Sequence, residues 1–422
     1  MAVTYTYAVR YEVEAVCRTP LRTGAVDGDP QMILQSRDGT ALIQGASLAG
    51  ALREWLEIGD AGMAETLFGS QKQAGRLLLS DGVFDRTAER YTRPRLRING
   101  VTGTADTGAK FDMAQLGSGS TFRFSMTWLG LDAREEEWKA VGQMLAALHG
   151  GAIRLGAQKS NGFGRVELRA WKRVFHLTDP TDRTAWLEGR YQGEPFALPA
   201  LTRVRNVTFV VTGQADSLLV KAGAPLKDGD TQYTPNLTEG GRAVLPGSSI
   251  KGAVRARVEM IARLLGLPDE KAEELFGRMS ADGDDGKPGR VYFEDGRLSG
   301  EKAQRISRIR LNRLTGGVIR GGLFSEEPLA CGVELRISAP NDPTACALLL
   351  YALRDLGLGF YNLGSGGSIG RGCISVREIR AITPDGGEAR LLFDAERVCT
   401  AQDPDGIFQM WLDELGGKTH EM

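Results

Sequence analysis

Hydrophobic and polar residues alternate at the start of the chain, where every second residue from Val3 to Ala15 is apolar. A similar alternation returns in the second half at Val207, Phe209 and Val211. A period of two is typical of a β-strand with one buried face. Each half of the chain is therefore expected to open with a strand.

Apolar residues recur at every fourth position from Leu48 to Leu56 and again from Ile250 to Val258. This spacing places them on one face of a helix, so a helix is expected after each opening strand. Ser47 and Ser249 stand near the two helix starts, where a hydroxyl can accept from a free backbone N–H group. They are the predicted capping residues.

The remaining elements also appear twice. "RLLLSDG" (76–82) and "RVYFEDG" (290–296) are short apolar runs that end in a turn dipeptide, as strands entering a hairpin do. A second helix is predicted from the stripe Trp138, Val141, Leu145 and Leu148, and its counterpart begins at Asp342. A final strand follows each glycine-rich stretch. The order β-α-β-β-α-β, found twice, predicts an α+β protein with two ferredoxin-like domains.

Sequence identity between the halves supports a duplication. "IQGASLAGALREWLE" (43–57) returns as "LPGSSIKGAVRARVE" (245–259), and "LGAQKSNGFGRVEL" (155–168) corresponds to "LGSGGSIGRGCISV" (363–376). A period of about 200 residues is a whole domain and not a solenoid repeat. We expect a first domain at 1–170, a proline-containing linker at 171–200, a second domain at 201–380 and a C-terminal extension at 381–422.

Composition limits the kinds of binding site and cellular location that the protein can have. The net charge of the 422 residues is −1, so a nucleic-acid-binding surface would have to be a local patch. The five cysteines lack CxxC spacing and the three histidines do not cluster, which argues against a disulfide framework and against zinc. No segment is long and apolar enough for a membrane span or a signal peptide. A soluble, cytoplasmic protein without a membrane partner is expected.

Glycines and a hydroxyl surround the helix start "PGSSIKG" (246–252), where free N–H groups and the helix dipole favour an anion. Lys251 and Arg255 lie one turn apart on the same face. The motif predicts a phosphate cradle; the alternative is a tight turn and capping box with solvated basic side chains. The glycines of "LGSGGSIGRG" (363–372) would allow close approach to a ligand, or form a simple connection.

Basic residues accumulate in each copy between the short apolar run that enters the hairpin and the second predicted helix. No acidic residue occurs from Lys302 to Ser325, whereas five arginines do. The first copy has a similar group from Arg86 to Arg97, with Tyr91 among them. A solvated hairpin face would explain either group, but recurrence in both copies favours a track for a polyanion.

Taken together, these motifs resemble those of the RAMP superfamily, and most closely the backbone subunits of type III CRISPR effector complexes. The resemblance covers nearly the whole chain apart from the linker and the tail. It implies ferredoxin-like, RRM-like domains in which the helix start and the glycine loop hold guide RNA. It also implies that the segments around 90–111 and 305–324 are β-hairpin thumbs that enter the guide–target duplex.

The resemblance thus names a set of RNA-binding residues. At the helix starts they are Gly45, Ser47, Arg53, Gly247, Ser248, Ser249, Lys251 and Arg255. In the glycine loops they are Lys159, Gly162, Gly164, Gly366, Gly367 and Arg371. In the hairpins they are Arg97, Arg308, Arg310, Arg313 and Arg320. The first copy departs from the family motif, because Gln44 replaces the proline and Ala49 the lysine.

Cleavage in the related backbone subunits depends on an aspartate in the loop between the first strand and the first helix. Asp29 and Asp228 occupy that place, with Asp27 and Asp230 as neighbours that could substitute. The resemblance implies that Asp29 and Asp228 help to place a divalent metal, Mg²⁺ or Mn²⁺, while the 2′-OH of the RNA attacks. An Asp next to Gly or Pro is also ordinary turn chemistry.

The resemblance predicts a subunit that binds guide RNA and cuts complementary target RNA once per copy, beside other CRISPR effector subunits. Two alternatives stay open. A non-catalytic RAMP subunit could cap one end of the guide. A stand-alone guide-processing endoribonuclease would usually need a histidine near its active site, and none lies in the shared motifs.

Overall fold

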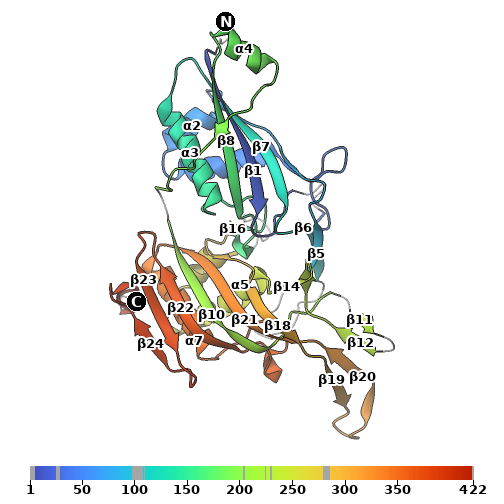
Figure 1. Cartoon of the computed structure of the whole chain (residues 1–422). Coiled ribbons are helices and arrows are strands. Elements are labelled where there is room, and N and C mark those ends of the chain that lie inside the picture. The colour runs from blue at the N-terminus through green and yellow to red at the C-terminus, as the bar shows by residue number, and fades with distance from the viewer. Residues whose placement is uncertain are drawn as a thin grey trace. The chain divides into compact units, whose positions relative to one another are not determined.

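The computed structural model describes residues 5–24, 29–96, 108, 110–202, 205–223, 225–228, 231–278 and 286–420. The chain divides into two compact units. The first contains Met1–Arg95, Phe111–Lys159 and Phe163–Val204; the second contains Arg205–Met422 with Leu96–Lys110 and Ser160–Gly162. Each unit combines a large antiparallel sheet with helices (Figure 1), which confirms the mixed α+β class. Among the described residues, no helix is long and apolar enough to cross a membrane.

The first unit is built on a seven-stranded sheet of order β2-β4-β7-β1-β8-β9, in which β3 also pairs with β7. The strands are β1 (Tyr7–Cys17), β2 (Leu42–Ile43), β3 (Leu77–Leu79), β4 (Gly82–Phe84), β7 (Thr121–Gly130), β8 (Val166–His176) and β9 (Glu194–Pro195). The helices are α1 (Gly45–Glu57), α2 (Ala61–Phe68) and α3 (Glu135–His149). As the alternation predicts, Val9, Tyr11 and Val13 of β1 point into one core.

The second unit repeats this plan with the order β17-β21-β10-β22-β23-β24, in which β18 also pairs with β21. The strands are β10 (Asn206–Leu218), β17 (Tyr292–Phe293), β18 (Arg297–Ala303), β21 (Leu329–Pro340), β22 (Ile374–Ile382), β23 (Glu388–Phe393) and β24 (Cys399–Gln402). The helices are α5 (Gly247–Leu264), α6 (Asp269–Phe276), α7 (Pro343–Gly357) and α8 (Ile407–His420). Short pairs join β13 (Thr238–Glu239) with β14 (Arg242–Ala243) and β15 (Gly277–Arg278) with β16 (Lys287–Pro288).

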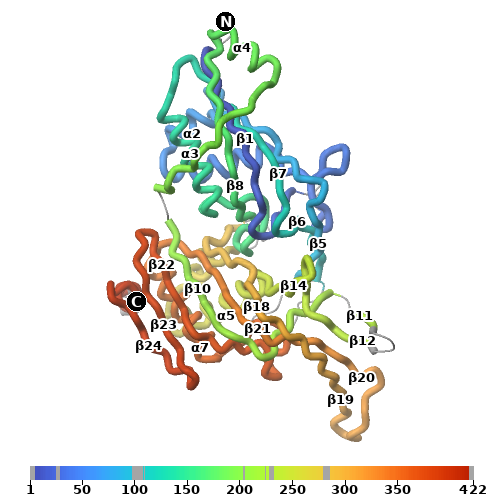
Figure 2. The backbone as a smooth tube through the Cα atoms, viewed as in Figure 1, coloured from blue at the N-terminus to red at the C-terminus, as the bar shows by residue number. Residues whose placement is uncertain are grey.

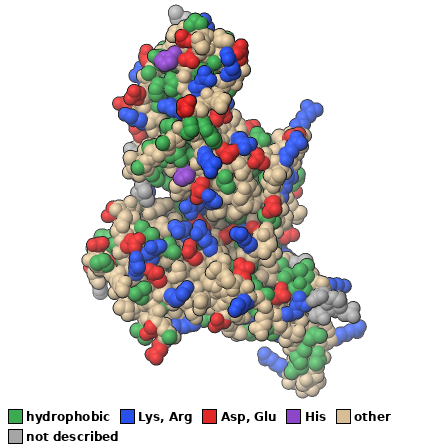
Figure 3. All heavy atoms as spheres, viewed as in Figure 1, with side chains coloured by type: hydrophobic (Ala, Val, Ile, Leu, Met, Phe, Trp, Pro, Cys, Tyr) green, Lys and Arg blue, Asp and Glu red, His purple; other side chains and the backbone are tan. Residues whose placement is uncertain are grey.

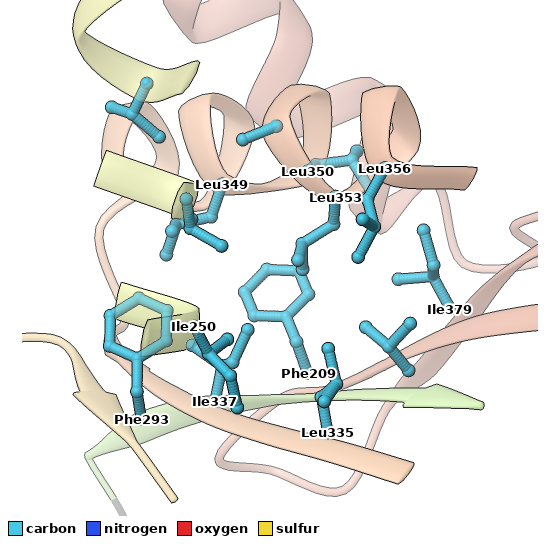
Figure 4. Packing of buried hydrophobic residues seen from close by; sticks show 14 of the residues in the cluster. Phe209, Ile250, Phe293, Leu335, Ile337, Leu349, Leu350, Leu353, Leu356 and Ile379 are labelled. Carbon is cyan, nitrogen blue, oxygen red and sulfur yellow. The ribbon is translucent and has the colours of Figure 1, made fainter. Parts of the chain in front are cut away.

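The core of the second unit lies between its sheet and the helices α5, α7 and α8. Leu349, Leu353 and Leu356 of the helix face Phe209 of the central strand, with Ile379 of β22 beside them (Figure 4). These side chains are almost completely buried. The duplicated sequence therefore gives two equivalent cores: a first strand lies between two antiparallel neighbours, and helices cover one face of the sheet.

Each copy also carries a β-hairpin outside its main sheet. In the first copy β5 (Arg90–Arg95) pairs with β6 (Phe111–Leu116). In the second copy β19 (Ile306–Leu311) pairs with β20 (Val318–Glu326), which extends away from the main sheet of its unit (Figures 1 and 2). β11 (Leu226–Asp228) and β12 (Thr231–Thr234) complete a small sheet of order β11-β12-β20-β19.

The segment 171–200, which the sequence suggests is a linker, is folded onto the first unit. β8 continues to His176, α4 (Pro180–Leu187) follows, and β9 pairs with β8 so that Pro195 lies opposite Trp171. Phe175 is buried in a small cluster on one side, and Phe196 packs against the main core. Two of the three prolines of this segment, Pro180 and Pro195, stand at the start of α4 and in an edge strand, which are positions that tolerate proline.

The extension 381–422 is likewise integrated. β22 runs to Ile382, β23 and β24 lengthen the sheet, and α8 packs against α7. Trp411 of α8 is fully buried in the core of the second unit. The core of this unit is therefore incomplete without the extension.

Candidate nucleic-acid interface

The two helix starts are capped by equivalent aspartates. The Gly45 N–H donates to Asp81 Oδ1 at 2.7 Å, and the Gly247 N–H donates to Asp295 Oδ1 at 2.8 Å. Both aspartates belong to the turn dipeptides that follow β3 and β17. The prediction that serines cap these helices is wrong, because Ser47 and Ser249 lie inside the first turn and no side-chain cap is formed there.

Packing explains the glycine at each helix start. A Cβ on Gly45 would lie 2.9 Å from the carbonyl oxygen of Leu79, and one on Gly247 would lie 2.0 Å from that of Phe293. Real Cβ atoms do not approach a carbonyl oxygen so closely. The two glycines therefore allow the helix to rest against the preceding strand. Ser47 is exposed, and Ser248 and Ser249 are half-buried.

The basic residues near the start of α5 differ in the contacts that they make within the protein. Arg255 forms an ion pair with Glu259, Nε to Oε1 at 2.6 Å, and its Nη1 donates to the Gly277 carbonyl at 3.0 Å. Lys251 is half-buried, and burial together with the Arg255 charge lowers the pKa of its ammonium to about 8. Arg255 therefore supports the fold, whereas the charge of Lys251 depends on its surroundings near neutral pH.

In the first copy the corresponding arginine is held more loosely. Arg53 Nε lies 3.8 Å from Glu57 Oε2, an ion pair at the same helical spacing. Lys159, at the glycine loop, lies 3.5 Å from Glu54 through its Nζ. Both pairs are at the surface, where such contacts contribute little to stability. An anion could compete for either cation at small cost.

The two glycine loops have the same backbone. Both contain a short 3₁₀ turn, Lys159–Asn161 in the first and Gly367–Ile369 in the second. Positive φ angles occur at four corresponding positions, namely Gly156 and Gly364, Gln158 and Gly366, Gly162 and Gly370, and Gly164 and Gly372. Gln158 is the one residue among these eight that is not glycine, and it still adopts the left-handed conformation, with φ at 64°.

Some of these glycines are needed by the fold and others leave space. A Cβ on Gly164 would lie 1.9 Å from the Leu155 carbonyl oxygen, and one on Gly372 would lie 1.7 Å from that of Leu363. Gly367 has no such neighbour, because its nearest contact would be at 3.5 Å, and no heavy atom lies within 4 Å of a Cβ on Gly370. The open side of the second loop is therefore at Gly367 and Gly370, where a ligand backbone has room.

The residue before the last glycine of each loop contacts the base of the hairpin, with different chemistry in the two copies. In the first copy it is Phe163, whose ring lies 5.4 Å from the Arg93 guanidinium and 5.5 Å from that of Arg95. In the second copy it is Arg371, a buried residue whose Nη1 donates to Glu326 Oε2 at 2.6 Å. Arg371 therefore connects the loop to the hairpin.

Glu326 also attracts two further cations. Lys221 Nζ lies 3.0 Å from Oε1, and Arg308 Nε lies 4.0 Å from Oε2. Burial opposes ionisation of this carboxyl, yet the hydrogen bonds from Lys221 and Arg371 hold its pKa below the usual range. The carboxylate is thus charged at neutral pH and surrounded by more positive charge than it neutralises.

The second hairpin exposes both apolar and basic side chains (Figure 3). Arg310 lies 5.5 Å from the ring centroid of Phe324. Arg313 and Arg320 are exposed and make no ion pair with any residue that the structure describes. The exposed apolar residues are Ile309, Leu311, Leu314, Val318, Ile319 and Leu323. A soluble hairpin seldom exposes so many large apolar side chains together, so a binding role is indicated.

The arginines of the first hairpin are mostly engaged within their own unit. Arg86 pairs with Asp38, and Arg90 donates to the Gly39 carbonyl at 2.8 Å. Arg93 and Arg95 are buried. Arg97 lies outside the described residues. The two basic segments that look alike in the sequence therefore differ in how much charge they offer to a ligand.

The candidate cleavage aspartates have different local structures. Asp29 is exposed in a turn, and its Oδ1 accepts from the Gln31 N–H at 2.8 Å. Asp228 ends β11 and pairs with Thr231, and its side chain lies outside the described part of the chain. Asp27 and Asp230 also lie outside it. The described residues contain no group of three His, Cys, Asp or Glu side chains that could hold a metal ion.

A buried arginine beneath the Asp29 turn does not stand out in the sequence. Arg22 is 8% exposed, and its guanidinium donates to three backbone carbonyls, among them that of Asp29. Burial lowers the pKa of Arg22, and the nearby Asp29 charge partly opposes this shift. The only available signal is that Lys221 stands at the same place in the second copy, 199 residues later.

Two of the histidines have packing roles. His149 Nδ1 lies 3.2 Å from the Leu168 backbone, and His176 packs edge-on against the Tyr7 ring. Neither histidine lies in the sequence motifs that the two copies share. They therefore offer no catalytic pair to the glycine loops or to the Asp29 turn.

Comparison with known proteins places the chain in a family. A similar solved chain comes from a cryo-EM structure of the Type III-B Cmr-beta bound to cognate target RNA, with 19% sequence identity and a TM-score of 0.32. That match covers 40% of this chain and 61% of the other. No curated protein matches the sequence. The family model of the RAMP superfamily matches residues 14–167 and 204–375, which together make up most of the chain. The chain therefore belongs to the RAMP superfamily, with two regions of that family in tandem.

Proposed function

We propose that this chain is a guide-RNA-binding backbone subunit of a type III CRISPR effector complex, in which one polypeptide joins two RNA-holding modules. The main support for this proposal is that both copies form the same helix start, glycine loop and hairpin, although their sequences have diverged. A repeated surface suits a repeated ligand, and a single-stranded RNA backbone repeats at every nucleotide. Guide RNA, complementary target RNA and other effector subunits would be its partners.

The strand order supports a ferredoxin-like, RRM-like topology for each copy. β1 lies between β7 and β8, with β3 and β4 on the far side of β7. β10 lies between β21 and β22 in the same way, with β17 and β18 beyond β21. This is the order of a β-α-β-β-α-β unit whose second strand is split in two.

Guide binding is best supported in the second copy. The open positions Gly367 and Gly370 admit a backbone, and Lys251 supplies a positive charge whose desolvation a phosphate would offset. The β19–β20 hairpin adds exposed apolar side chains and the cations Arg313 and Arg320. Apolar side chains between base steps and cations on phosphates would suit a hairpin that enters a guide–target duplex.

Target cleavage would fall to Asp29 in the first copy. Its carboxylate is exposed, and a hydrogen bond from Gln31 fixes one oxygen while Oδ2 makes no hydrogen bond with the described residues. Positioning of the attacking 2′-OH, the phosphorus and the leaving oxygen in line would supply most of the rate. Asp228 is the candidate in the second copy, and its location at a strand end weakens its equivalence to Asp29.

A divalent cation fits Asp29 only as an ion shared with RNA. Mg²⁺ is commonly held by one or two carboxylates together with substrate phosphates. Asp29 Oδ2 would be the protein ligand in such a site. The ion would stabilise negative charge on the phosphate as the bond to the leaving oxygen breaks. The chain itself supplies the fixed carboxylate and the carbonyl-bound Arg22 beneath it.

The alternative of a non-catalytic subunit at one end of the guide has one observation in its favour. The two copies are unequal, since the first hairpin buries Arg93 and Arg95 whereas the second exposes its arginines. A capping subunit needs only one module to follow the guide. The guide-processing endoribonuclease has no comparable support, because His149 and His176 are used in packing.

RNA that copurifies with the protein tests the proposal. A backbone subunit should carry RNAs of uniform length that derive from repeat-spacer arrays. Random cellular RNA, or none, would rule out the CRISPR assignment. The chain with Arg134→Ala, which removes an exposed ion pair with Asp132 outside the proposed interface, serves as a control and should carry the same RNA as the parent.

Cut-site mapping tests the catalytic part. With a complementary target and Mg²⁺, Asp29→Ala should remove one cut, and Asp228→Ala should remove a second if that copy is active. Asp38→Ala, a change in another exposed turn of the first unit, should leave the cuts unchanged. If the cut assigned to Asp29 persists when Asp29 and Asp228 are both replaced by alanine, the aspartates are turn residues and the end-capping function is favoured.

A further inference from the structure

We propose that Arg22 couples the Asp29 turn to the first hairpin, so that RNA bound on the hairpin sets the position of the Asp29 carboxylate. This inference rests on the proposed function, in which Asp29 acts on target RNA. Arg22 would be a positioning residue, since it reaches the backbone of the turn and not the reacting atoms.

The guanidinium of Arg22 joins two separate segments. Its Nη1 donates to the Pro30 carbonyl at 2.9 Å and to the Ala114 carbonyl at 2.7 Å, and its Nη2 lies 3.4 Å from the Asp29 carbonyl. Ala114 belongs to β6, the second strand of the hairpin. Because the side chain is 8% exposed, water does not readily replace these bonds.

The turn is also attached to the hairpin directly. The Ala114 N–H donates to the Pro30 carbonyl at 2.9 Å, so this one oxygen accepts from both the hairpin and Arg22. One residue further on, the Gln31 N–H donates to Asp29 Oδ1. A displacement of β6 must therefore either carry Pro30 with it or break these bonds. If Pro30 moves, Gln31 and the bound carboxylate move too.

The backbone of Arg22 extends the connection to the glycine loop. The Ala157 N–H donates to the Arg22 carbonyl at 2.9 Å, in a bridge between the two residues. Gly156 allows this approach, since a Cβ there would lie 2.2 Å from the same carbonyl oxygen. Arg22 thus contacts the three parts of the proposed site in the first copy, namely the guide-binding loop, the hairpin and the Asp29 turn.

The second copy links its candidate aspartate to its hairpin in another way, through the backbone of β12, which pairs with both β11 and β20. Lys221 stands at the corresponding position and reaches the hairpin through Glu326. A lysine has one ammonium and cannot fork between several carbonyls as a guanidinium does. The backbone of Asp228 is instead held in β11 by Thr231. Among the described residues, only the first copy joins its candidate aspartate to its hairpin through one side chain.

The test uses Arg22→Met in the assembled, guide-loaded complex. Single-turnover cleavage of target at the Asp29-dependent site should slow by about tenfold or more, because small misplacements of a catalytic group cost that much. Target affinity should change by less than about twofold. Complexes with Arg18→Met or Arg134→Met, which each remove an exposed ion pair from the first unit, should cut at the parent rate.

Hydrogen exchange supplies a readout that does not depend on cleavage. In the parent complex, target binding should slow exchange of the Ala114 and Gln31 amides together. In Arg22→Met it should still slow that of Ala114, whereas the slowing at Gln31 should become smaller, because only the direct bond from the Ala114 N–H to the Pro30 carbonyl then remains. A residue that merely stabilises the fold would change both amides before target is added and would leave their response to target coupled.

The outcomes separate the inference from the proposed function. A parent complex that never cuts at this site removes the catalytic role of Asp29, and the exchange response then decides the coupling alone. Cleavage at the parent rate, or a Gln31 response in Arg22→Met that is as large as in the parent, overturns the coupling. If the Arg22→Met variant does not assemble into the complex, the same two measurements are made on Arg22→Lys. Lysine keeps the positive charge but cannot donate to several carbonyls at once as the guanidinium does.

Discussion

At the scale of single residues, both copies use a distant carboxylate to complete a helix. Asp81 and Asp295 accept from the first N–H of α1 and α5, and they come from turns 36 and 48 residues away. Local sequence favours the serines at the helix starts, because a hydroxyl near an N-terminus is the usual cap. The competing carboxylate could not be predicted, since its position depends on how the strand packs against the helix.

Asp295→Ala should lower the free energy of unfolding of the second unit by about 1 kcal/mol, as removal of a helix cap does. Urea unfolding of the full chain measures it. Asp132→Ala, which breaks an exposed ion pair with Arg134 in the first unit, should change this free energy by less than about 0.5 kcal/mol. Equal effects of the two changes would show that the Asp295 bond has no special value.

Lys251 should make RNA binding depend on pH. In the free protein its pKa is about 8, below the ordinary 10.5, so the ammonium gives up its proton as pH rises through 8. Nearby phosphates favour the charged form, and binding above pH 8 therefore takes up a proton. Affinity for single-stranded RNA should fall between pH 7 and 9.5, and Lys251→Met should weaken that dependence. Parallel pH curves for parent and variant would contradict this.

The same residue has the opposite effect on the stability of the free protein. Because the folded pKa is lowered, the fold disfavours the protonated lysine. This penalty is fully present below pH 8 and is absent above about 10.5, where both the folded and unfolded states are neutral. Lys251→Met should therefore stabilise the RNA-free chain at pH 7 but not at high pH, as thermal unfolding at both pH values would show.

At the scale of elements, the repeated hydrophobic pattern predicts the strands and helices that form the two cores. β1, β10, α1 and α5 occur where the periodicity predicts them. The split of the second strand into β3 and β4, the folding of 171–200 and the burial of Trp411 could not be predicted. Each depends on packing between segments that are distant in the sequence, and a single-sequence period carries no such information.

The candidate site divides in a similar way. Sequence motifs locate the glycine loops and the hairpins, because glycine and arginine are distinctive there. They do not distinguish Arg371, which is buried on Glu326, from Arg313, which is exposed. Nor do they identify Arg22. Whether a cation is available to a ligand depends on its ion-pair partners and its exposure. Both are determined by how the hairpin packs against the glycine loop in the folded chain.

Glu326 and Arg371 should behave as a coupled pair that holds the second hairpin on the glycine loop. Glu326→Leu alone leaves a buried guanidinium without its carboxylate and should cost about 3–5 kcal/mol of unfolding free energy. The double change Glu326→Leu, Arg371→Met should cost less than the sum of the single changes. A double-mutant cycle by urea unfolding gives the coupling, and strict additivity would mean that the two residues act independently.

Arg313 and Arg320 should contribute to RNA binding without contributing to stability. Removal of one cation that binds a phosphate should reduce the slope of log affinity against log salt by about 0.7–0.9. The double alanine variant should therefore lower the slope by up to about twice that value, with unchanged thermal unfolding. Arg255→Ala is the matched control, because its side chain is occupied by Glu259 and Gly277 and should affect unfolding more than the salt slope.

In the chain as a whole, the two RAMP regions share one fold and one set of candidate binding elements, but these elements have diverged in sequence and in exposure. The first copy ties its candidate aspartate to its hairpin through Arg22 and keeps most hairpin arginines within the unit. The second exposes its hairpin cations and places its aspartate at a strand end. A division of labour follows, in which the first copy is the better candidate for cleavage and the second for holding RNA.

The proposed function requires both copies to hold the same guide RNA. Ultraviolet crosslinking of the copurified RNA, followed by mass spectrometry of the crosslinked peptides, shows which segments contact it. We predict crosslinks in both glycine loops, 155–168 and 363–376, to guide nucleotides separated by one fixed interval. Crosslinks confined to one copy, or spread over the guide without a fixed interval, would show that the two copies do not hold the guide together.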